Sequence, residues 1–299
     1  MGLFRKLFGG GSAKEPKLRQ SPPKPSAPGP ARPTSLESAP ARPAPPAAPS
    51  NKGADMVRLA GDGRVSVVGE SHYQPALKAA AHGRTVAEGD LDNAIPVNAV
   101  LVPEPKNKYD RNAVRVDVEG RTAGYLSRET AVLYQPVLLQ LQAESKLGWC
   151  PGRIMGGGRR SYGLYLHMSP PERLVCVNLP RDLKILDADR NVTVTGEEKH
   201  QDTLESIAAG RDTVAVFASF APCKIAKGKY AGAEGVEVRI DDERVGELTK
   251  AMSDRYGPVV RAVAAGGNEP GCEALVMTSV RGYQVELRMP RQDDLQDES

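Results

Sequence analysis

Two stretches of the chain alternate between apolar and polar residues, and each begins a similar series of predicted elements. Residues 65–69 and 192–196, VSVVG and VTVTG, have the period of two that is typical of a strand with one buried face. Each stretch runs into Gly-Glu and then into a helix start. In the first stretch, Pro75 stands near the N-terminus of the predicted helix, and Gly83 is expected to end it.

A short apolar segment precedes each of these strands. The segments are MVRL (56–59) and LKIL (183–186), and turn-forming residues follow them at 61–63 and 188–191. An apolar segment, a turn and an alternating segment are the signature of two paired strands. We therefore predict that each series opens with a strand pair.

The rest of each series is also mainly strand. In the first series, two further strands are predicted near 97–102 and 113–118. The pattern then predicts a helix in each series, with Ser127 as the N-cap in the first and Thr249 in the second. A last alternating strand follows at 162–168 or 283–289. Mostly strands with about two helices, in roughly 110 residues, indicates a mainly β (α+β) domain built as a small, partly open barrel.

Alignment of the sequence with itself relates the two series. Three blocks align in the same order, at offsets of 127, 122 and 121 residues: 65–77 with 192–204, 112–138 with 234–260, and 161–168 with 282–289. Because the offset changes so little along the chain, we interpret the body as a tandem duplication with one domain in each copy. The predicted domains are residues 54–172 and 173–291.

The N-terminal segment has a different composition. Twelve of the 25 prolines in the 299-residue chain precede residue 53, in runs with almost no aliphatic residues. Such a segment has too little apolar surface to offset the entropy of ordering it, so we expect residues 11–53 to be a disordered, proline-rich linker. Residues 1–10 have the pattern of a short amphipathic helix that contacts a partner or a membrane surface, with random terminal composition as the alternative. Residues 292–299 are expected to be an acidic disordered tail.

Charge is unevenly distributed along the chain. Residues 1–53 contain nine basic and two acidic residues, a net charge of +7. The first predicted domain has 14 basic and 13 acidic residues, and the rest of the chain has 17 and 22, a net charge of −5. This distribution excludes a body that coats nucleic acid with uniform positive charge, although a local basic patch remains compatible with it.

Cysteine spacing and hydropathy indicate the compartment. Cys150, Cys176, Cys223 and Cys272 form no close pair, and no histidine stands beside one of them at the spacing of zinc ligands. Free, buried thiols in a reducing cytoplasm fit this pattern. No apolar run approaches the roughly 18–20 residues that span a bilayer. We expect a cytoplasmic protein with no metal and no cofactor.

Three ordered motifs resemble a known family. They are VVGESHYQPAL (67–77), LVPEPKNKYDRNAVRVDVEGRTAGYLSRETA (101–131) and SYGLYLHM (161–168), and together they resemble the HIRAN domain. This small OB-like β-barrel is found alone in bacteria and is fused to helicase and ubiquitin-ligase regions in eukaryotes. In characterised members it is similar to a cap that binds the free 3′-hydroxyl end of single-stranded DNA. The resemblance implies a stand-alone bacterial protein with two OB-like barrels, the second one degenerate.

The resemblance implies a role for several side chains. Tyr109 and Asp110 would line the pocket of the terminal nucleotide, where an ionised carboxylate accepts a hydrogen bond from the 3′-hydroxyl and repels a phosphate. Arg128 would neutralise a phosphate near a helix N-terminus. The implied nucleic-acid-binding set is Ser71, His72, Tyr109, Asp110, Tyr125, Arg128 and Tyr162, with Tyr162 as a second stacking surface.

Some residues depart from the family pattern or have structural alternatives. The family usually has proline where Lys108 stands, and its eukaryotic DNA-binding members have a basic residue at Ser71 and histidine at Tyr125. Asp110 is also a common turn residue, and Tyr162 has a partner, Tyr283, in the other copy, so both have structural alternatives. A structural or surface role is likewise an alternative for His72, His82 and His167.

Two other patterns suggest chemistry but have simpler explanations. The GGGRR segment, residues 156–160, resembles a phosphate-cradling loop and equally fits the tip of a hairpin. Glu104, Asp110 and Asp117 could hold a metal ion, but strand alternation places Asp110 and Asp117 on opposite faces. The chain has no Walker loop, nucleophile elbow, His-Glu-x-x-His helix or Cys-x-x-Cys pair.

The second copy lacks the implied pocket. Tyr230 stands at the motif tyrosine, but Ala231 and Gly232 follow it, and Glu247 and Lys250 replace Tyr125 and Arg128. We therefore predict a non-enzymatic protein whose first domain binds a single-stranded DNA 3′ end, in DNA repair or replication-fork processing. The second domain is expected to serve as a scaffold or to bind a protein. The alternative is a protein-interaction adaptor that binds no nucleic acid.

Overall fold

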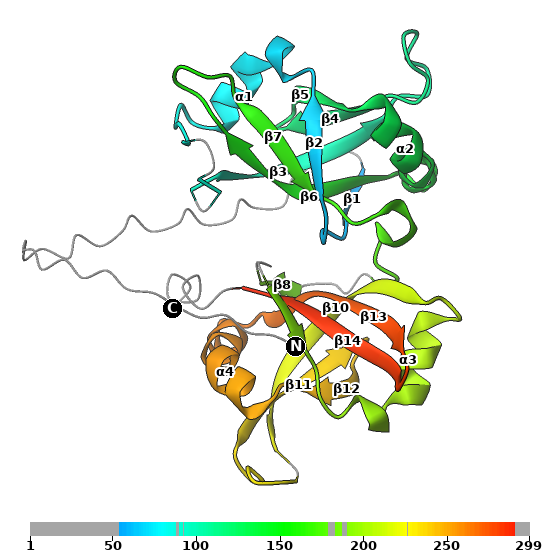
Figure 1. The fold of residues 1–299 in the computed structure, drawn as a ribbon, viewed down its shortest axis with the longest axis vertical. Helices are drawn as coiled ribbons and strands as arrows, with labels where there is room; N and C mark the ends of the chain where they lie inside the picture. Colours follow the sequence, from blue (N-terminus) through cyan, green and yellow to red (C-terminus); the bar gives the residue numbers. More distant parts are fainter. Residues whose placement is uncertain are drawn as a thin grey trace, which may run out of the picture. The chain divides into compact units, whose positions relative to one another are not determined.

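The computed structural model describes residues 54–87, 90–91, 93–178, 183–186, 190–225 and 227–290. The predicted helix at 1–10, linker at 11–53 and tail at 292–299 lie outside these described residues. The described part is mainly β, with four α-helices and two β-barrels, as the alternation pattern predicted (Figure 1). Among these residues, no helix is long and apolar enough to cross a membrane.

Six strands close the first barrel. The sheet runs β1-β6-β3-β4-β5-β2-β7, and pairing of β6 with β7 completes the circle. The elements are β1 (Asp55–Arg58), β2 (Arg64–Val68), the 3-10 turn η1 (Glu70–His72), α1 (Gln74–Ala80), β3 (Ile95–Pro103), β4 (Val114–Val118), β5 (Arg121–Leu126), α2 (Arg128–Ala143), β6 (Lys146–Met155), β7 (Gly163–His167) and η2 (Pro171–Arg173). The barrel is therefore closed, where the sequence suggested a partly open one.

The second barrel repeats this order of elements. Its sheet runs β12-β11-β10-β13-β14-β9, and an isolated bridge between Thr195 and Glu247 links β9 to β12. The elements are β8 (Leu183–Ile185), β9 (Arg190–Thr193), η3 (Glu197–Lys199), α3 (Gln201–Ala208), β10 (Thr213–Lys224), β11 (Glu234–Ile240), β12 (Glu243–Glu247), α4 (Lys250–Ala265), β13 (Glu269–Ser279) and β14 (Gly282–Met289).

The predicted opening strand pair is wrong in both series. β1 pairs in parallel with β6, from Asp55 opposite Lys146 to Arg58 opposite Trp149, while β2 pairs with β5 and β7. β8 likewise pairs in parallel with β13. The turn residues correctly predict where each strand ends. Which strand it pairs with depends on how the barrel closes, and a local sequence pattern carries no information on that.

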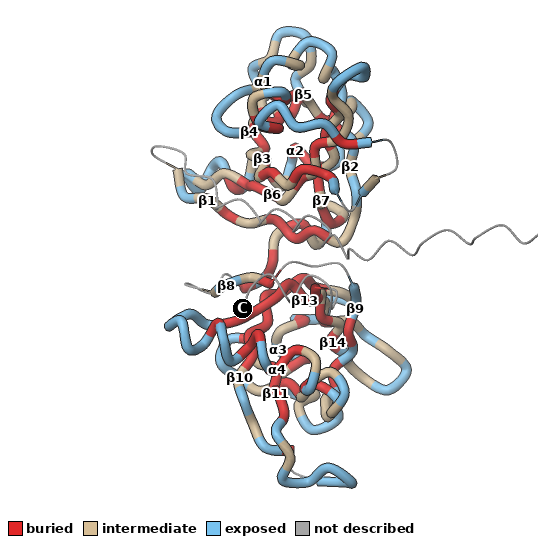
Figure 2. The backbone as a smooth tube through the Cα atoms, turned by 90° about the vertical axis from the view of Figure 1, so that its left-hand side faces the viewer, coloured by how far each residue is buried: buried red, intermediate tan, exposed pale blue. Residues whose placement is uncertain are grey.

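Each barrel encloses its own apolar core, in which side chains alternate with the strand period. In β3 every second residue is buried, and Leu101 is fully enclosed. Figure 2 shows the same buried stretches along the strands of both barrels. The first core also takes Leu174, and Leu59 bridges to Val175, so this barrel continues beyond the predicted boundary at residue 172.

Both barrels have a glycine at the point where two neighbouring strands approach closely. A Cβ atom on Gly124 would overlap the side chain of Val67 and lie 2.7 Å from the Val68 carbonyl oxygen, so β5 approaches β2 closely only because this residue is glycine. Gly246 has the same relation to Val194 and Thr195 in the second barrel.

In both barrels, a glutamate and a glutamine form hydrogen bonds to the backbone at the last strand. Gln74 clamps the backbone of Tyr162, because its side-chain oxygen accepts from the amide N–H (2.8 Å) and its Nε2 donates to the carbonyl (2.9 Å). Glu70 Oε1 accepts from the Leu164 amide at 3.2 Å. Gln201 and Glu197 make the same contacts to β14. The Gly-Glu-x-x-x-Gln pattern of both stretches therefore has a structural function, since it ties the start of the helix to the last strand.

A buried carboxylate also links the two barrels, which belong to one compact unit. Glu273 on β13 is 4% exposed and accepts hydrogen bonds from Arg58 Nε and from the Gly61 amide, both at 2.9 Å. Pairing and hydrogen bonding are what allow a carboxylate to be buried at this low exposure. A small apolar cluster accompanies this contact: Ala60, Cys176, Ala215 and Phe217.

The predicted free thiols are confirmed. All four cysteines are unpaired, with Cys150, Cys176 and Cys272 buried and Cys223 half-buried. Burial raises the pKa of the three buried thiols, so they are protonated and behave as small apolar side chains.

Candidate functional site

The loop between β3 and β4 is held rigidly by its own side chains. Asn107 Oδ1 accepts from the amides of Tyr109 (2.9 Å) and Asp110 (3.3 Å), and Asp110 Oδ1 accepts from the Asn112 amide at 2.9 Å. Gln135 on α2 donates to the carbonyls of Arg111 and Ala113 at the end of the loop. These are the backbone-mimicking bonds that Asn and Asp form in turns. The turn interpretation of the Asp-x-Asn pair is therefore correct for one carboxylate oxygen of Asp110.

This rigid loop presents an aromatic ring to solvent. Tyr109 is 81% exposed, and Lys108 Nζ lies 5.3 Å from the centre of its ring. An exposed aromatic ring on a fixed loop loses little entropy when a flat partner stacks on it. Tyr109 is thus an exposed ring, and Lys108 adds a positive charge beside it.

The second oxygen of Asp110 faces the start of α2. Arg128 Nε is 3.7 Å from Asp110 Oδ2, with the arginine side chain 82% exposed and the carboxylate 24% exposed. Ser127 caps the helix by accepting from the Thr130 amide, which leaves Arg128 as the first helical residue. Three of the implied residues, Tyr109, Asp110 and Arg128, therefore lie on two adjoining segments, with a carboxylate oxygen and a guanidinium next to one another.

Tyr125, near the end of β5, lies beside a second aromatic ring. The rings of Tyr125 and Tyr73 have centroids 6.2 Å apart, tilted by 48°. Burial, followed by the charge of Glu104 and the contact with Tyr73, raises the pKa of the Tyr125 hydroxyl, which is therefore a neutral hydrogen-bonding group. Sequence reasoning missed Tyr73, although it is part of the first motif.

The outer face of β4 next to Tyr125 has its own ion-pair group. Arg115 lies directly across the strand pair from Tyr125 and bonds Glu104 (2.5 Å) and Asp117 (2.9 Å). The hydrogen bond to Asp117, together with the two negative charges, raises the pKa of Arg115 against the effect of burial. Because Arg115 sits between Glu104 and Asp117, these carboxylates are paired with a cation. Among the described residues, no cluster of three potential metal ligands is found.

Ser71 and His72 are exposed on η1, which contacts β5. Gly69 adopts a left-handed conformation, with φ of 79°, and so turns the chain from β2 into η1.

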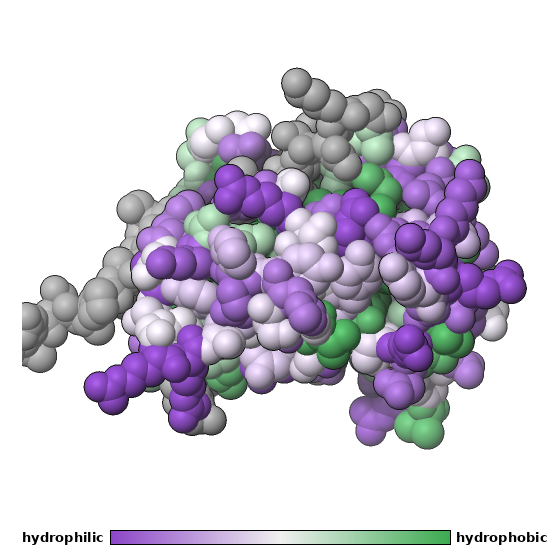
Figure 3. Space-filling view, turned by 90° about the horizontal axis from the view of Figure 1, so that it is seen from above, coloured by the Kyte–Doolittle hydropathy of each residue, from purple (hydrophilic) through white to green (hydrophobic). Residues whose placement is uncertain are grey.

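Figure 3 shows the surface of the molecule seen from the top of Figure 1, the end at which α1 of the first barrel lies. Polar residues predominate on that face, and apolar residues appear only in small separate groups.

Tyr162 is the exception among the implied residues. It is 7% exposed, it belongs to the barrel core, and its hydroxyl donates to the Arg84 carbonyl at 2.9 Å. The prediction of a second stacking surface therefore does not hold for this side chain, which packs inside the barrel. Strand alternation explains the result, since Tyr162, Leu164 and Leu166 all point inward.

The glycine-rich segment 156–160 forms the connection between β6 and β7. Gly156, Gly157 and Gly158 all have positive φ, and a Cβ on Gly157 would overlap the ring of Tyr162. The hairpin interpretation is therefore correct. All three glycines suit the backbone geometry, and Gly156 and Gly157 are also needed for space.

The corresponding face of the second barrel is built differently. Tyr230 is 48% exposed with Lys229 Nζ 5.4 Å from its ring centre, as in the first barrel. In place of Arg115 and Tyr125, however, Glu237 and Glu247 stand opposite each other, and Arg244 bonds both. This side of the barrel is occupied by its own ion pairs.

A comparison with known families covers most of these residues. Residues 61–153 match the HIRAN domain family. HIRAN domains are in general nucleic-acid-binding modules and not catalytic domains. The match covers every implied residue except Tyr162, which lies beyond its end. No curated protein and no solved structure matches the chain.

Proposed function

We propose that the HIRAN region of the first barrel binds the free 3′ end of single-stranded DNA. One observation carries this proposal: Asp110 uses one carboxylate oxygen to hold its loop and directs the other toward Arg128, beside the exposed ring of Tyr109. An anion, a cation and a stacking surface are the three groups that a terminal nucleotide requires.

Each group has a distinct role in the proposed complex. Tyr109 stacks on the last base, a contact worth roughly 1–3 kcal/mol. Asp110 Oδ2 accepts the hydrogen bond from the 3′-hydroxyl, and Arg128 balances a neighbouring phosphate. A 3′-phosphate would bring negative charge against the carboxylate, so the site selects a hydroxyl end. Ser71, His72 and Tyr125 border the same site.

The test compares Asp110→Asn with the unchanged protein. Asparagine retains an oxygen that accepts from the Asn112 amide, so the loop keeps its turn while the second acceptor and the negative charge are lost. We expect the preference for a 3′-hydroxyl over a 3′-phosphate oligonucleotide, measured by fluorescence anisotropy, to disappear. Arg128→Ala should weaken both ligands and leave the preference in place. An unchanged preference in Asp110→Asn would contradict the role of the carboxylate. Equal, negligible affinity for every oligonucleotide at low salt would favour the protein-interaction adaptor.

We further propose that the second barrel is a degenerate HIRAN-like copy that arose by tandem duplication. The support is the common order of elements and the shared Gly124/Gly246 and Gln74/Gln201 contacts. Ala231 stands where Asp110 would be needed, so this copy serves as a scaffold or docks a protein. The whole chain is proposed to be a non-enzymatic bacterial protein of the cytoplasm. It would act in DNA repair or replication-fork processing, and residues 1–10 would contact a partner or membrane surface.

A further inference from the structure

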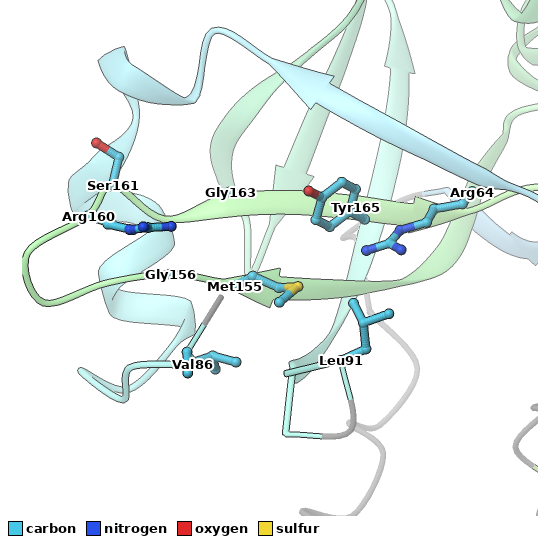
Figure 4. Close-up of a pocket in the computed structure, with 10 residues that line it drawn as sticks. Arg64, Val86, Leu91, Met155, Gly156, Arg160, Ser161, Gly163 and Tyr165 are labelled. Atoms are coloured by element: carbon cyan, nitrogen blue, oxygen red, sulfur yellow. The ribbon is translucent and has the colours of Figure 1, made fainter. Parts of the chain in front are cut away.

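A cavity on the first barrel lies outside the group formed by Tyr109, Asp110 and Arg128. It has a volume of about 430 Å³ and is lined by residues of β2, β6, β7 and the adjoining connections. Figure 4 shows Arg64 beside the ring of Tyr165, with Met155 and Leu91 next to them and Arg160 and Ser161 at the other end of the cavity. A cavity of this size fits a nucleotide-sized ligand.

The central feature of the cavity is an arginine stacked on a tyrosine. Arg64 Cζ lies 4.0 Å from the centre of the Tyr165 ring, and Arg64 is exposed. When a guanidinium lies against a ring, its N–H groups can still donate to a phosphate, and its other face can still stack on a base. Because the ring already restricts the arginine, less entropy is lost when a ligand binds.

Arg64 supplies the positive charge of this pair. Among the described residues that line the cavity, none is acidic. An exposed cation beside an aromatic ring can attract a phosphodiester backbone even though the first domain as a whole is nearly neutral.

The second barrel provides an internal comparison at the same register. Asn191 and Glu286 occupy the positions of Arg64 and Tyr165, and Asn191 Nδ2 donates to Glu286 Oε1 at 2.7 Å. The strand pairing is equivalent, so the arginine and the tyrosine are not required for this barrel to fold. A cation and an aromatic ring have been replaced there by a carboxylate and its hydrogen-bond partner, which would repel a phosphate.

The cavity lies next to η1. A Cβ on Gly163, which lines the cavity, would lie 3.8 Å from Glu70 Oε1, and Glu70 begins the turn that presents Ser71 and His72.

We propose that the Arg64–Tyr165 cavity is a second nucleic-acid subsite that binds an internal nucleotide of a single strand, through its phosphate and base and without regard to the strand end. This inference rests on the proposed nucleic-acid binding by the first barrel. It adds a prediction that end recognition does not make, because a subsite for internal nucleotides also accepts a strand without ends.

The experiment replaces Arg64 and Tyr165 by the residues found at the equivalent positions of the second barrel. The variant is the double substitution Arg64→Asn with Tyr165→Glu in the full chain. The ligand is a circular single strand of DNA, which has no 3′ end. We expect this variant to bind it at least about tenfold more weakly than the unchanged protein at low salt, through loss of one phosphate contact and one stacking contact. The slope of log affinity against log salt should decrease by about one.

Arg121→Glu is the matched control. Arg121 is exposed, does not line the cavity, and its substitution changes the net charge by the same two units. This control should bind the circular strand within about twofold of the unchanged protein. Equal binding by the double variant and Arg121→Glu would overturn the subsite, as would absence of binding to the circle by the unchanged protein. If no 3′-hydroxyl preference exists but circular binding depends on Arg64 and Tyr165, end recognition is wrong and the subsite stands.

Discussion

The outer faces of the two barrels differ far more than their interiors do. Both barrels use a glycine where β5 or β12 crosses the neighbouring strand, a glutamate and glutamine that clamp the last strand, and a Ser or Thr helix cap. On the outside, Tyr125 corresponds to Glu247 and Tyr165 to Glu286. Positions that close the barrel therefore have the same chemistry in both barrels, while the outer faces of the paired strands differ at these two positions, where the first barrel has a tyrosine and the second a glutamate. The comparison separates residues that build the fold from residues that are free to differ between the barrels.

The strongest test of the common interior is the glycine at the strand crossing. Gly124→Ala and Gly246→Ala should each destabilise the protein by about 2–3 kcal/mol, because the added Cβ overlaps a valine side chain and a backbone carbonyl in both barrels. The free energy of unfolding from chemical denaturation measures the effect. Gly120→Ala is a useful control, since a Cβ there meets nothing within 4 Å and only its φ of 72° opposes the change, at about 1 kcal/mol. A large loss in one barrel and none in the other would show that the crossings are not equivalent.

The ion pairs on the outer faces should contribute unequally to the stability of the two barrels. Glu237 has a side chain only 10% exposed and pairs with Arg239 and Arg244, whereas the Arg115 side chain is 31% exposed. Glu237→Gln should cost about 1–2 kcal/mol of stability, since the buried acceptor loses its charge. Arg115→Gln should cost less than about 1 kcal/mol because its pairs are reached by solvent. Denaturation of the two variants side by side checks the order, and the reverse order would contradict this account of the second barrel.

The smallest predicted difference concerns pH. Burial, and then the positive charges of Arg244 and Lys199, lower the pKa of His200 below its ordinary value of 6.5. The unfolded chain therefore binds this proton more readily than the folded one, so the stability contribution is complete above pH 6.5 and decreases as the pH falls through 6.5 toward the folded pKa. His200 is only partly buried, and the effect is small. NMR titration of the ring protons should give a midpoint below 6.5, and a midpoint at or above that value would contradict the prediction.

Much of the candidate site could be anticipated from the sequence, but not all of it. Tyr109, Asp110 and Arg128 were identified from motif positions, and they lie close together because a short loop and a helix start bring them there. Tyr162 was misassigned because the motif alone does not show that this residue, just before β7, points into the barrel. Gln74 and Gln201 were aligned in the two copies, yet their contacts lie 88 and 82 residues away along the chain. Nothing local indicates such contacts.

The sequence by itself determined the two series of elements, because alternation and caps are properties of neighbouring residues and the two copies repeat them. It also determined which copy retains the acid of the proposed end site. Only the tertiary structure decided that β1 pairs in parallel with β6, that the first barrel closes through β6 and β7, and that Arg64 lies on the ring of Tyr165. These contacts join segments about 90 to 100 residues apart or depend on closure of the sheet. Their partners are selected by packing of the whole barrel, which a local pattern of apolar and polar residues cannot encode.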